Sequence, residues 1–185
     1  MIQFYAPDIE ETGILPETES GHCCRVLRMK EGDSIRVTDG KGKIFECIIL
    51  EAHPKHTAVE IVSESEILPW WGFRLEICVA PSKNMDRIEW LVEKAVEIGA
   101  DRIVLMRCAR SERKTVKTER LAKIAISAMN QSLKANLTEI TDMTDFKALV
   151  TDGFEGYRCM GYCDENFPLR GFAGEYKGGD VRILI

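Results

Sequence analysis

The side chains best suited to chemistry form a dense cationic run in the second half of the chain. The run contains Arg107, Arg110, Arg113, Lys114, Lys117, Arg120 and Lys123, and only Glu112 and Glu119 interrupt it. Closely spaced cations favour a polyanion such as RNA, because each cation neutralises a phosphate and releases counterions. A cation in the first turn of a helix opposes the helix dipole, so helix stability does not account for Lys117 and Arg120. The alternative interpretation is a solvated charged surface without a ligand.

Other catalytic motifs are missing from the sequence. It contains no P-loop, no GxGxxG and no Ser-His-Asp or Cys-His set at a recognisable spacing. The 3 histidines are not at zinc spacing and the 7 cysteines contain no C-x-x-C pair, so we predict no metal. Cys159 and Cys163 come nearest, and we interpret them as small apolar residues of a strand. Glu89, Glu93 and Glu97 share one helix face, which indicates a solvated stripe more than acid–base chemistry.

The elements that position the cationic run are predicted from apolar spacing. Apolar residues recur at helical intervals over residues 85–98, and Gly99 follows as a left-handed cap. The apolar run 102–106 then predicts a buried strand, and the cations begin where this strand ends. A second helix is predicted over residues 118–133. Because ligands bind where the strands of open α/β sheets end, the cations are expected at the functional edge of a sheet.

From Arg74 onward, strand and helix patterns alternate. Strands are predicted over 75–80, 137–140, 157–162 and 181–185, with a short helix over 145–150. Such alternation predicts an α/β domain with a mostly parallel sheet and helices on both faces.

The first part of the chain has a different pattern. Short strands over 34–38, 43–50 and 57–62, separated by turn residues, predict a small β-barrel. A short helix is expected over 20–27 with Ser20 as its N-cap. Residues 67–73 read as a joint, where Trp70 and Trp71 either pack the two domains together or stack on bases.

Composition limits the function classes. The chain has 185 residues, 45% of them hydrophobic, and a formal net charge of -5, which argues against general coating of nucleic acid but permits a local basic patch. No apolar run reaches the length of a membrane span, and the acidic N-terminus does not resemble a secretory signal. The odd number of cysteines predicts free thiols and a cytoplasmic location.

Three segments, in order along the chain, carry a family resemblance. They are HCCRVLR at 22–28 with Gly32-Asp33 and Asp39-Gly40; Lys83, Glu89-Trp90, KAVEIG at 94–99 and Arg110-Ser111; and Arg120 with AMNQSLK at 128–134. Together they are similar to the RsmE family of 16S ribosomal RNA uridine-N3 methyltransferases, in the knotted SPOUT superfamily. The resemblance covers nearly the whole chain, although Lys134 and Thr138 stand where the family commonly has Arg and Pro.

The resemblance implies a PUA-like RNA-binding β-barrel over 1–68 and a SPOUT domain over 73–185. It implies S-adenosylmethionine as cofactor, 16S rRNA of the small ribosomal subunit as partner, and a homodimer at full length, without a membrane or a metal. The family's G-P-E-G run after the last strand does not occur in this sequence. We therefore expect a C-terminally truncated chain that lacks the knot-forming segment and does not methylate RNA alone.

The resemblance also suggests roles for individual residues. Arg110 is the expected catalytic residue, because a cation stabilises the anion left when uridine N3 loses its proton. The cofactor pocket is expected to involve Tyr162, Cys163, Leu184 and Ile185, and the RNA to contact Arg25, Arg28, Lys83, Arg113, Arg120 and Lys134. Two alternatives remain at this point: a non-catalytic RNA-binding or ribosome-assembly module, and an α/β enzyme acting on a small molecule.

Overall fold

Contacts divide the chain into two compact units, and each is described by itself. The computed structural model describes residues 2–69, 71–111, 113–162 and 172–185. The first unit comprises Met1–Pro69 and Ile126–Leu137, and the second comprises Trp70–Ala125 and Thr138–Ile185. In the described part of the chain, no helix combines the length and the apolar character that a membrane span requires.

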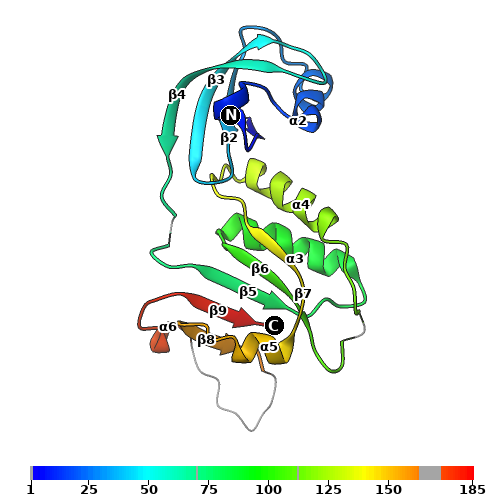
Figure 1. Ribbon diagram of the computed structural model, residues 1–185, viewed down its shortest axis with the longest axis vertical. Coiled ribbons are helices and arrows are strands. Elements are labelled where there is room, and N and C mark those ends of the chain that lie inside the picture. The colour runs from blue at the N-terminus through cyan, green and yellow to red at the C-terminus, as the bar shows by residue number, and fades with distance from the viewer. Residues whose placement is uncertain (1, 70, 112, 163–171) are drawn as a thin grey trace. The chain divides into compact units, whose positions relative to one another are not determined.

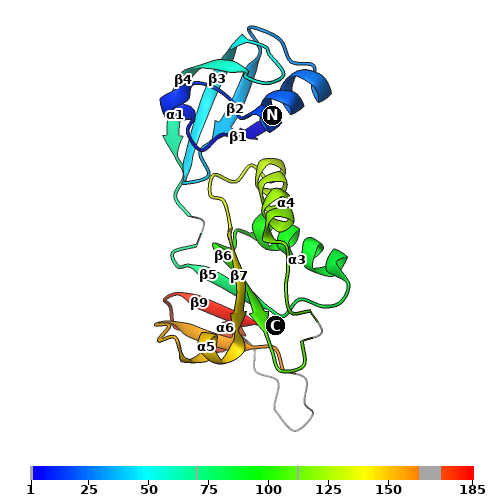
Figure 2. The same ribbon diagram turned by 45° about the vertical axis from the view of Figure 1, so that its right-hand side comes forward.

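The first unit is built on a four-stranded sheet. Its strands are β1 (Gln3–Tyr5), β2 (Ser34–Thr38), β3 (Lys43–Glu51) and β4 (Ala58–Glu66), side by side in the order β1-β2-β3-β4 (Figure 2). β1 pairs parallel with β2, and the other pairings are antiparallel. Phe4, Val37 and Phe45 are fully buried at the centre of the core, which also takes in Ile9 of the short helix α1 (Ile9–Thr12).

The predicted helix over 20–27 is wrong in its start and in its cap. The chain forms α2 (Glu17–Gly21) and then a π-helix, η1 (His22–Val26). Ser20 is buried inside α2, where its hydroxyl donates to the Leu15 carbonyl (2.9 Å) and accepts from the Thr57 N–H (2.9 Å). Ser20 therefore joins two loops, and buried polar groups need such partners more than a helix end needs a cap.

A later segment completes the first unit. The Thr38 hydroxyl donates to the Ala135 carbonyl (3.0 Å), and the Leu137 N–H donates to the Gly40 carbonyl (2.8 Å). These bonds tie residues 126–137 to the turn between β2 and β3. Gly40 has a φ of 74°, and a Cβ there would lie 2.7 Å from the Tyr5 ring, so the turn needs glycine.

The second unit contains the parallel sheet that the alternating pattern predicts. Its strands are β5 (Leu75–Val79), β6 (Arg102–Arg107), β7 (Glu139–Asp145), β8 (Tyr157–Met160) and β9 (Val181–Leu184), in the order β7-β6-β5-β9-β8 (Figure 1). Every pairing is parallel. Its helices are α3 (Met85–Ile98), α5 (Phe146–Thr151), α6 (Phe172–Glu175) and the first part of α4 (Thr118–Gln131), whose residues from Ile126 onward belong to the first unit. The predicted α/β class is confirmed.

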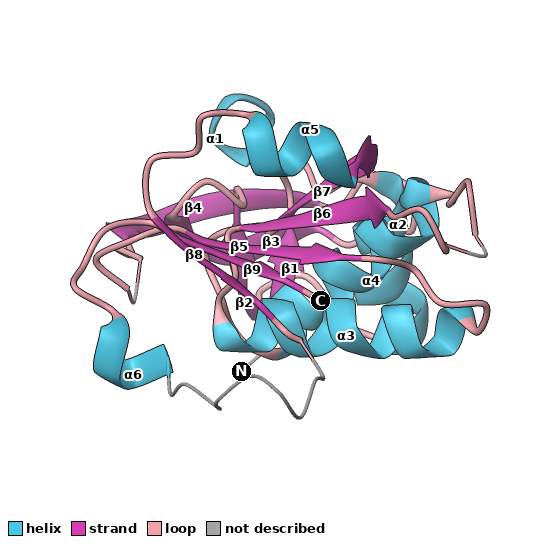
Figure 3. Ribbon diagram, turned by 90° about the horizontal axis from the view of Figure 1, so that it is seen from below, coloured by secondary structure: helices cyan, strands magenta, loops and turns pink. Residues whose placement is uncertain are grey.

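Both faces of this sheet are covered. Figure 3 shows α3 on one face and α5 on the other. Alternate residues of a strand point to opposite faces, and both sets are apolar here. Cys78, Val104 and Leu184 form a buried cluster with Leu149 of α5. This two-sided burial explains why the strands read as continuous apolar runs.

Helix α3 has the bounds that its sequence predicts. The Asn84 side chain accepts a hydrogen bond from the Asp86 N–H (2.9 Å), which caps the start. Gly99 ends the helix at a φ of 89°, in the left-handed conformation expected there.

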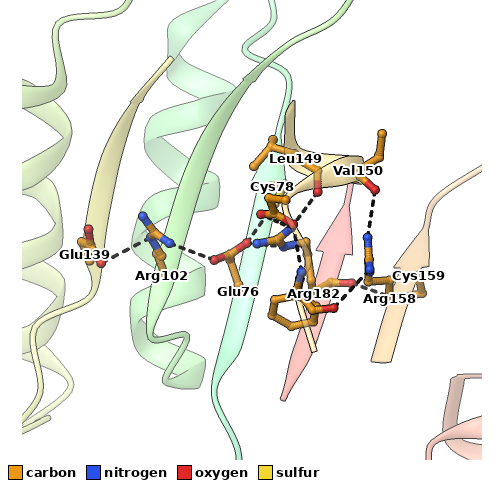
Figure 4. Close-up of polar contacts among 11 residues, drawn as sticks. Glu76, Cys78, Arg102, Glu139, Leu149, Val150, Arg158, Cys159 and Arg182 are labelled. Atoms are coloured by element: carbon orange, nitrogen blue, oxygen red, sulfur yellow. Dashed lines mark hydrogen bonds and ion pairs between the residues drawn. The ribbon is translucent and has the colours of Figure 1, made fainter. Parts of the chain in front are cut away.

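A chain of ion pairs crosses the sheet from β7 to β9 (Figure 4). Arg182 of β9 is 4% exposed, forms a close ion pair with Glu76 of β5, and donates to the Leu149 carbonyl (2.7 Å). Its Nη1 also meets Asp152 Oδ2 at 2.7 Å, at the end of α5. Glu76 in turn pairs with Arg102 of β6 at 3.3 Å. These contacts join β9 to its neighbouring elements through charge as well as through the backbone.

The ion pair between Arg182 and Asp152 predicts how the stability of the protein changes at acidic pH. Burial raises the pKa of Asp152, but hydrogen bonds from Arg182 and the Phe154 N–H outweigh it and lower the pKa below its usual range. A carboxylate with a lowered folded pKa adds stability that is present above its unfolded pKa of about 3.9 and lost as the pH falls through the folded value. We expect Asp152→Asn to be less stable than wild type at pH 7, with a smaller further loss below about pH 4.

Urea unfolding between neutral and acidic pH measures this difference. Glu155→Gln is the control, because Glu155 is an exposed carboxylate without a described partner. Parallel stability curves for wild type and Asp152→Asn down to acidic pH would contradict the prediction.

Candidate functional site

The direction in which the parallel sheet grows reverses between β5 and β9. After β5 the chain adds β6 and β7 on one side, whereas β9 and β8 lie on the other. Ligands of open parallel sheets bind at such a point, beyond the carboxyl ends of the strands. The segments following three strands meet there: the Ala80 N–H donates to the Ile185 carbonyl (3.0 Å) and the Gly161 N–H to the Leu184 carbonyl (2.9 Å).

A cationic pocket lies in the segments that follow β5 and β6. Its volume is about 600 Å³, and the described residues of its lining are Lys83, Arg113, Lys114 and Thr115. The Arg113 guanidinium donates to the Lys83 carbonyl (2.9 Å), which joins the two segments. Arg113 Nε is buried and has no hydrogen-bond partner among the described residues. Each of these four described side chains can donate a hydrogen bond and three are positive, so this part of the lining suits an anion.

Arg110 lies in a turn directly after β6. The Cys108 N–H donates to the Ser111 hydroxyl (2.8 Å), and the Ser111 N–H donates to the Cys108 carbonyl (3.0 Å). This pair of bonds closes the turn that presents Arg110. Arg110 is exposed and makes no side-chain bond with any described residue, so its charge is available to a ligand.

Other cations of the run have partners within the protein. Arg107 pairs with Asp145 at 2.7 Å, and this hydrogen bond holds the pKa of Asp145 below its usual range. Arg120 pairs with Glu89 of α3 at 2.7 Å. That pair accounts for a cation at the start of α4 without any ligand, which weakens the argument from the helix dipole. Glu93 and Glu97 both bind Lys94, so the acidic stripe of α3 is engaged in ion pairs.

Three of the expected cofactor residues, Tyr162, Leu184 and Ile185, lie at the same edge of the sheet but differ in exposure. Leu184 is 5% exposed and packs in the core, so it stabilises this edge of the sheet and does not face a ligand. Ile185 and Tyr162 are 56% and 59% exposed, just after β9 and β8. Cys163 lies outside the described residues.

The remaining predicted residues belong to the first unit. Arg25, on η1, and Arg28 are exposed, and Arg28 has a φ of 56°. Lys134 is half-buried, and its carbonyl accepts a hydrogen bond from the Gln3 side chain (2.8 Å). Lys134 therefore belongs to the first unit and Arg110 to the second, although the sequence analysis predicted both as residues of one RNA site. The structure brings Lys83 and Arg113 together in one pocket, and it assigns Lys134 to another unit.

Comparison with known protein families decides the classification. A family model described as RNA methyltransferase domain matches residues 71–185, and one described as RNA methyltransferase PUA domain matches residues 15–62. The first model alone covers more than half of the chain. The chain belongs to the RsmE family of RNA methyltransferases.

Individual relatives agree with this assignment. The chain is 28% identical over 154 residues to ribosomal RNA small subunit methyltransferase E of Bacillus subtilis (strain 168), a match covering 78% of this chain and 57% of the relative. A crystal structure of a probable rRNA-methyltransferase from Porphyromonas gingivalis is 41% identical, with a TM-score of 0.91 over 100% of this chain and 79% of that one.

A more distant structure shares the fold. The ribosomal RNA small subunit methyltransferase E of Neisseria gonorrhoeae, solved bound to S-adenosyl methionine, is 21% identical, with a TM-score of 0.82 over 100% of this chain and 78% of that one.

Two residues of the pocket in this RsmE-family chain were not predicted as site residues. Lys114 belongs to the cationic run and therefore carried a signal, although the sequence could not separate it from solvated neighbours. Thr115 carried no signal, because an isolated hydroxyl is common on any surface.

Metal and thiol chemistry find no support in the described residues. They contain no group of three or more His, Cys, Asp or Glu side chains arranged to hold a metal ion. Six described cysteines are free, and burial raises the pKa of the Cys23 and Cys78 thiols to about 12. These two thiols stay protonated at neutral pH and serve as core residues.

Proposed function

We propose that the protein containing this chain transfers a methyl group from S-adenosylmethionine to N3 of a uridine in 16S rRNA. The observation that carries the proposal is the cationic pocket beside the switch point, where Arg113 Nε is buried and finds no partner among the residues the structure describes. Family membership supports RNA methylation, and the printed name of the Bacillus subtilis relative supports the small ribosomal subunit.

The cofactor is proposed from chemistry and from relatives together. A neighbour with the same fold was solved with S-adenosyl methionine bound. In this chain, exposed Tyr162 and Ile185 offer aromatic and apolar surface at the switch point, which suits the adenine and methionine parts of that molecule. S-adenosylmethionine supplies an electrophilic methyl group on a positively charged sulfur.

The residues of the chain would mainly position and neutralise charge. Lys83, Lys114 and Arg113 hold phosphates, which fixes the RNA beside the sheet edge. Uridine N3 loses its proton to a base or to water, forms the bond to the methyl carbon, and the sulfur leaves as a neutral thioether. Arg110 lowers the free energy of the N3 anion, because it is a cation that no described residue neutralises.

Mass spectrometry of the methylated RNA tests this proposal. The full-length protein, incubated with labelled S-adenosylmethionine and small ribosomal subunits, is expected to yield N3-methyluridine in 16S rRNA. Label at another position would refute the uridine-N3 assignment. Tight RNA binding without any transfer would instead favour a non-catalytic RNA-binding or ribosome-assembly module. Inactivity of the 185-residue piece alone, the homodimer and the cytoplasmic location stay predictions.

Lys83 and Lys114 provide a direct test of RNA binding. Both are exposed and make no described side-chain bond, so alanine at either position removes charge without disturbing packing. We expect each variant to weaken binding about equally for all RNA sequences and to reduce the slope of log affinity against log salt by about 1. Fluorescence anisotropy at several salt concentrations measures this slope.

The matched control is Lys147→Ala, which removes an exposed lysine from α5 in the same unit. Equal slopes for Lys83→Ala, Lys147→Ala and wild type would show that the pocket does not contact phosphates.

A further inference from the structure

A charged residue interrupts the short apolar strand β9. The strand reads VRIL, and its Arg182 is 4% exposed. Replacing a buried ion pair with apolar residues of similar size is often neutral for stability, because the cost of desolvation offsets the attraction between the charges. Stability therefore does not explain why this position carries a charge, and a second role has to be considered.

We propose that Arg182 is a positioning residue for S-adenosylmethionine, because its ion pairs fix the register of β9 in the parallel sheet. The carboxyl end of β9 forms part of the switch point, where ligands of such sheets bind. The inference deepens the proposed function and rests on it for the place of the cofactor.

The apolar residues of β9 do not determine its register by themselves. Arg182 and Leu184 lie on the α5 face of the sheet, and Val181 and Ile183 on the opposite face. A shift by one residue turns each side chain to the other face, which normally moves apolar groups into water. Both faces of this sheet are covered and apolar, so the apolar side chains of β9 oppose such a shift only weakly.

The partners of Arg182 are in reach at one register only. Arg182 lies directly opposite Glu76 in the pairing of β9 with β5, and their side chains form a close ion pair (Figure 4). Its Nη1 also donates to both carboxylate oxygens of Asp152 (2.8 and 2.7 Å), and its guanidinium carbon lies 4.3 Å from the centre of the Phe154 ring. After a shift by one residue, Arg182 would point into the opposite apolar face without these partners, and burying an unpaired charge is very costly.

The register of β9 also decides where the edge of the cofactor site lies. The Ile185 N–H donates to the Cys78 carbonyl (2.8 Å), and the Gly161 N–H donates to the Leu184 carbonyl (2.9 Å). A shift by one residue displaces these groups by about 3.3 Å along the strand. Because a misplacement of about 1 Å can already cost about 100-fold in activity, a β9 in the wrong register would not offer Ile185 to the cofactor.

Arg182→Met combined with Glu76→Met tests this assignment in the full-length protein. The double variant replaces the ion pair with apolar side chains, so we expect it to fold but to divide β9 between registers. The affinity for S-adenosylmethionine falls in proportion to the fraction of molecules in the native register. The loss is about tenfold if about one tenth of the molecules keep that register. Isothermal titration calorimetry with S-adenosylmethionine measures this loss without RNA.

Hydrogen exchange reports on the register itself. In the double variant, the amides of Ile185 and Gly161 should exchange much faster than in wild type, because their acceptors lie on or beside β9. Amides of β6, which lies between β5 and β7, should change only as far as global stability changes. A purely structural Arg182 would accelerate both sets of amides equally.

Steady-state methylation distinguishes positioning from catalysis. We expect the double variant to raise the KM for S-adenosylmethionine and to leave kcat near the wild-type value, because saturating cofactor selects the native register. Arg182→Lys keeps a cation between the carboxylates and should retain more affinity than Arg182→Met, although it loses the planar fork. The matched control is Arg36→Met with Glu46→Met, which removes an ion pair of the first unit and should bind S-adenosylmethionine as wild type does.

The outcomes separate this inference from the proposed function. Wild-type affinity of the Arg182→Met, Glu76→Met variant for S-adenosylmethionine would refute it. A loss of affinity with equal acceleration of exchange in β6 and β9 would also refute it, since the cause would then be general destabilisation. If the variant behaves as expected but the wild-type protein yields no N3-methyluridine, the inference survives and the proposed function fails. If the wild-type protein does not bind S-adenosylmethionine, both fail.

Discussion

Alanine at position 110 lowers the methylation rate of the full-length protein by about 100-fold to 1,000-fold, the usual effect of removing one donor to a developing anion. The expectation follows from position and from unused charge. Arg110 stands in the turn after β6, at the carboxyl edge of the sheet, and its guanidinium has no described partner. Because the side chain is exposed and unpaired, the free energy of unfolding should change by less than about 0.5 kcal/mol.

Single-turnover methylation and urea unfolding, measured on the same preparation, distinguish the two effects. Arg74→Ala is a matched control, because Arg74 is exposed at the amino end of β5, on the opposite edge of the same sheet. Arg110→Lys should retain part of the rate, since it keeps the charge and loses the planar fork. A rate for Arg110→Ala within a few-fold of the Arg74→Ala rate would exclude Arg110 from charge stabilisation.

The largest effect on stability is expected at Arg182. Arg182→Met leaves the carboxylates of Glu76 and Asp152 without their buried cation, and breaking a buried pair in this way costs about 3–5 kcal/mol. The double variant Arg182→Met with Glu76→Met should recover part of that loss, because it also removes one of the stranded charges.

Urea unfolding measures this loss, and Arg36→Met in the first unit is the control. Arg36 makes a similar pair with Glu46, but that pair is partly exposed and should contribute about 1 kcal/mol or less. If Arg182→Met lowered the free energy of unfolding no more than Arg36→Met does, burial of the network would not contribute to stability. If the double variant were no more stable than Arg182→Met, the explanation by stranded charge would fail.

Local features of the second unit were predictable from the sequence, and pairings over long distances were not. The helix over 85–98, its Gly99 cap and the strand that follows depend on neighbouring residues, so spacing alone predicted them. The position of β9 between β5 and β8 depends on packing across the sheet, which no local pattern encodes. Arg182 was visible as one cation in an apolar strand, whereas its partners Glu76 and Asp152 come from other elements.

The candidate site was predicted only in part, because it too depends on pairings between residues far apart in the sequence. The cationic run was evident, but the sequence could not show which charges are already neutralised within the protein. Arg120 pairs with Glu89, so its charge is already neutralised within the protein, whereas Arg113 Nε is buried and has no partner in the described part of the chain. In the first unit, Arg28 has a left-handed backbone, a conformation that composition does not reveal.

The discontinuous first unit has a consequence for synthesis on the ribosome. Its strands emerge early, yet the bonds from Thr38 to Ala135 and from Gly40 to Leu137 require a segment that is translated much later. Domains usually fold as units while the chain grows from its N-terminus, but this one has all four strands of its sheet long before residues 126–137, which complete the unit, have left the exit tunnel. During that interval the Thr38 hydroxyl and the Gly40 carbonyl, at the turn between β2 and β3, lack the partners that residues 135 and 137 later provide.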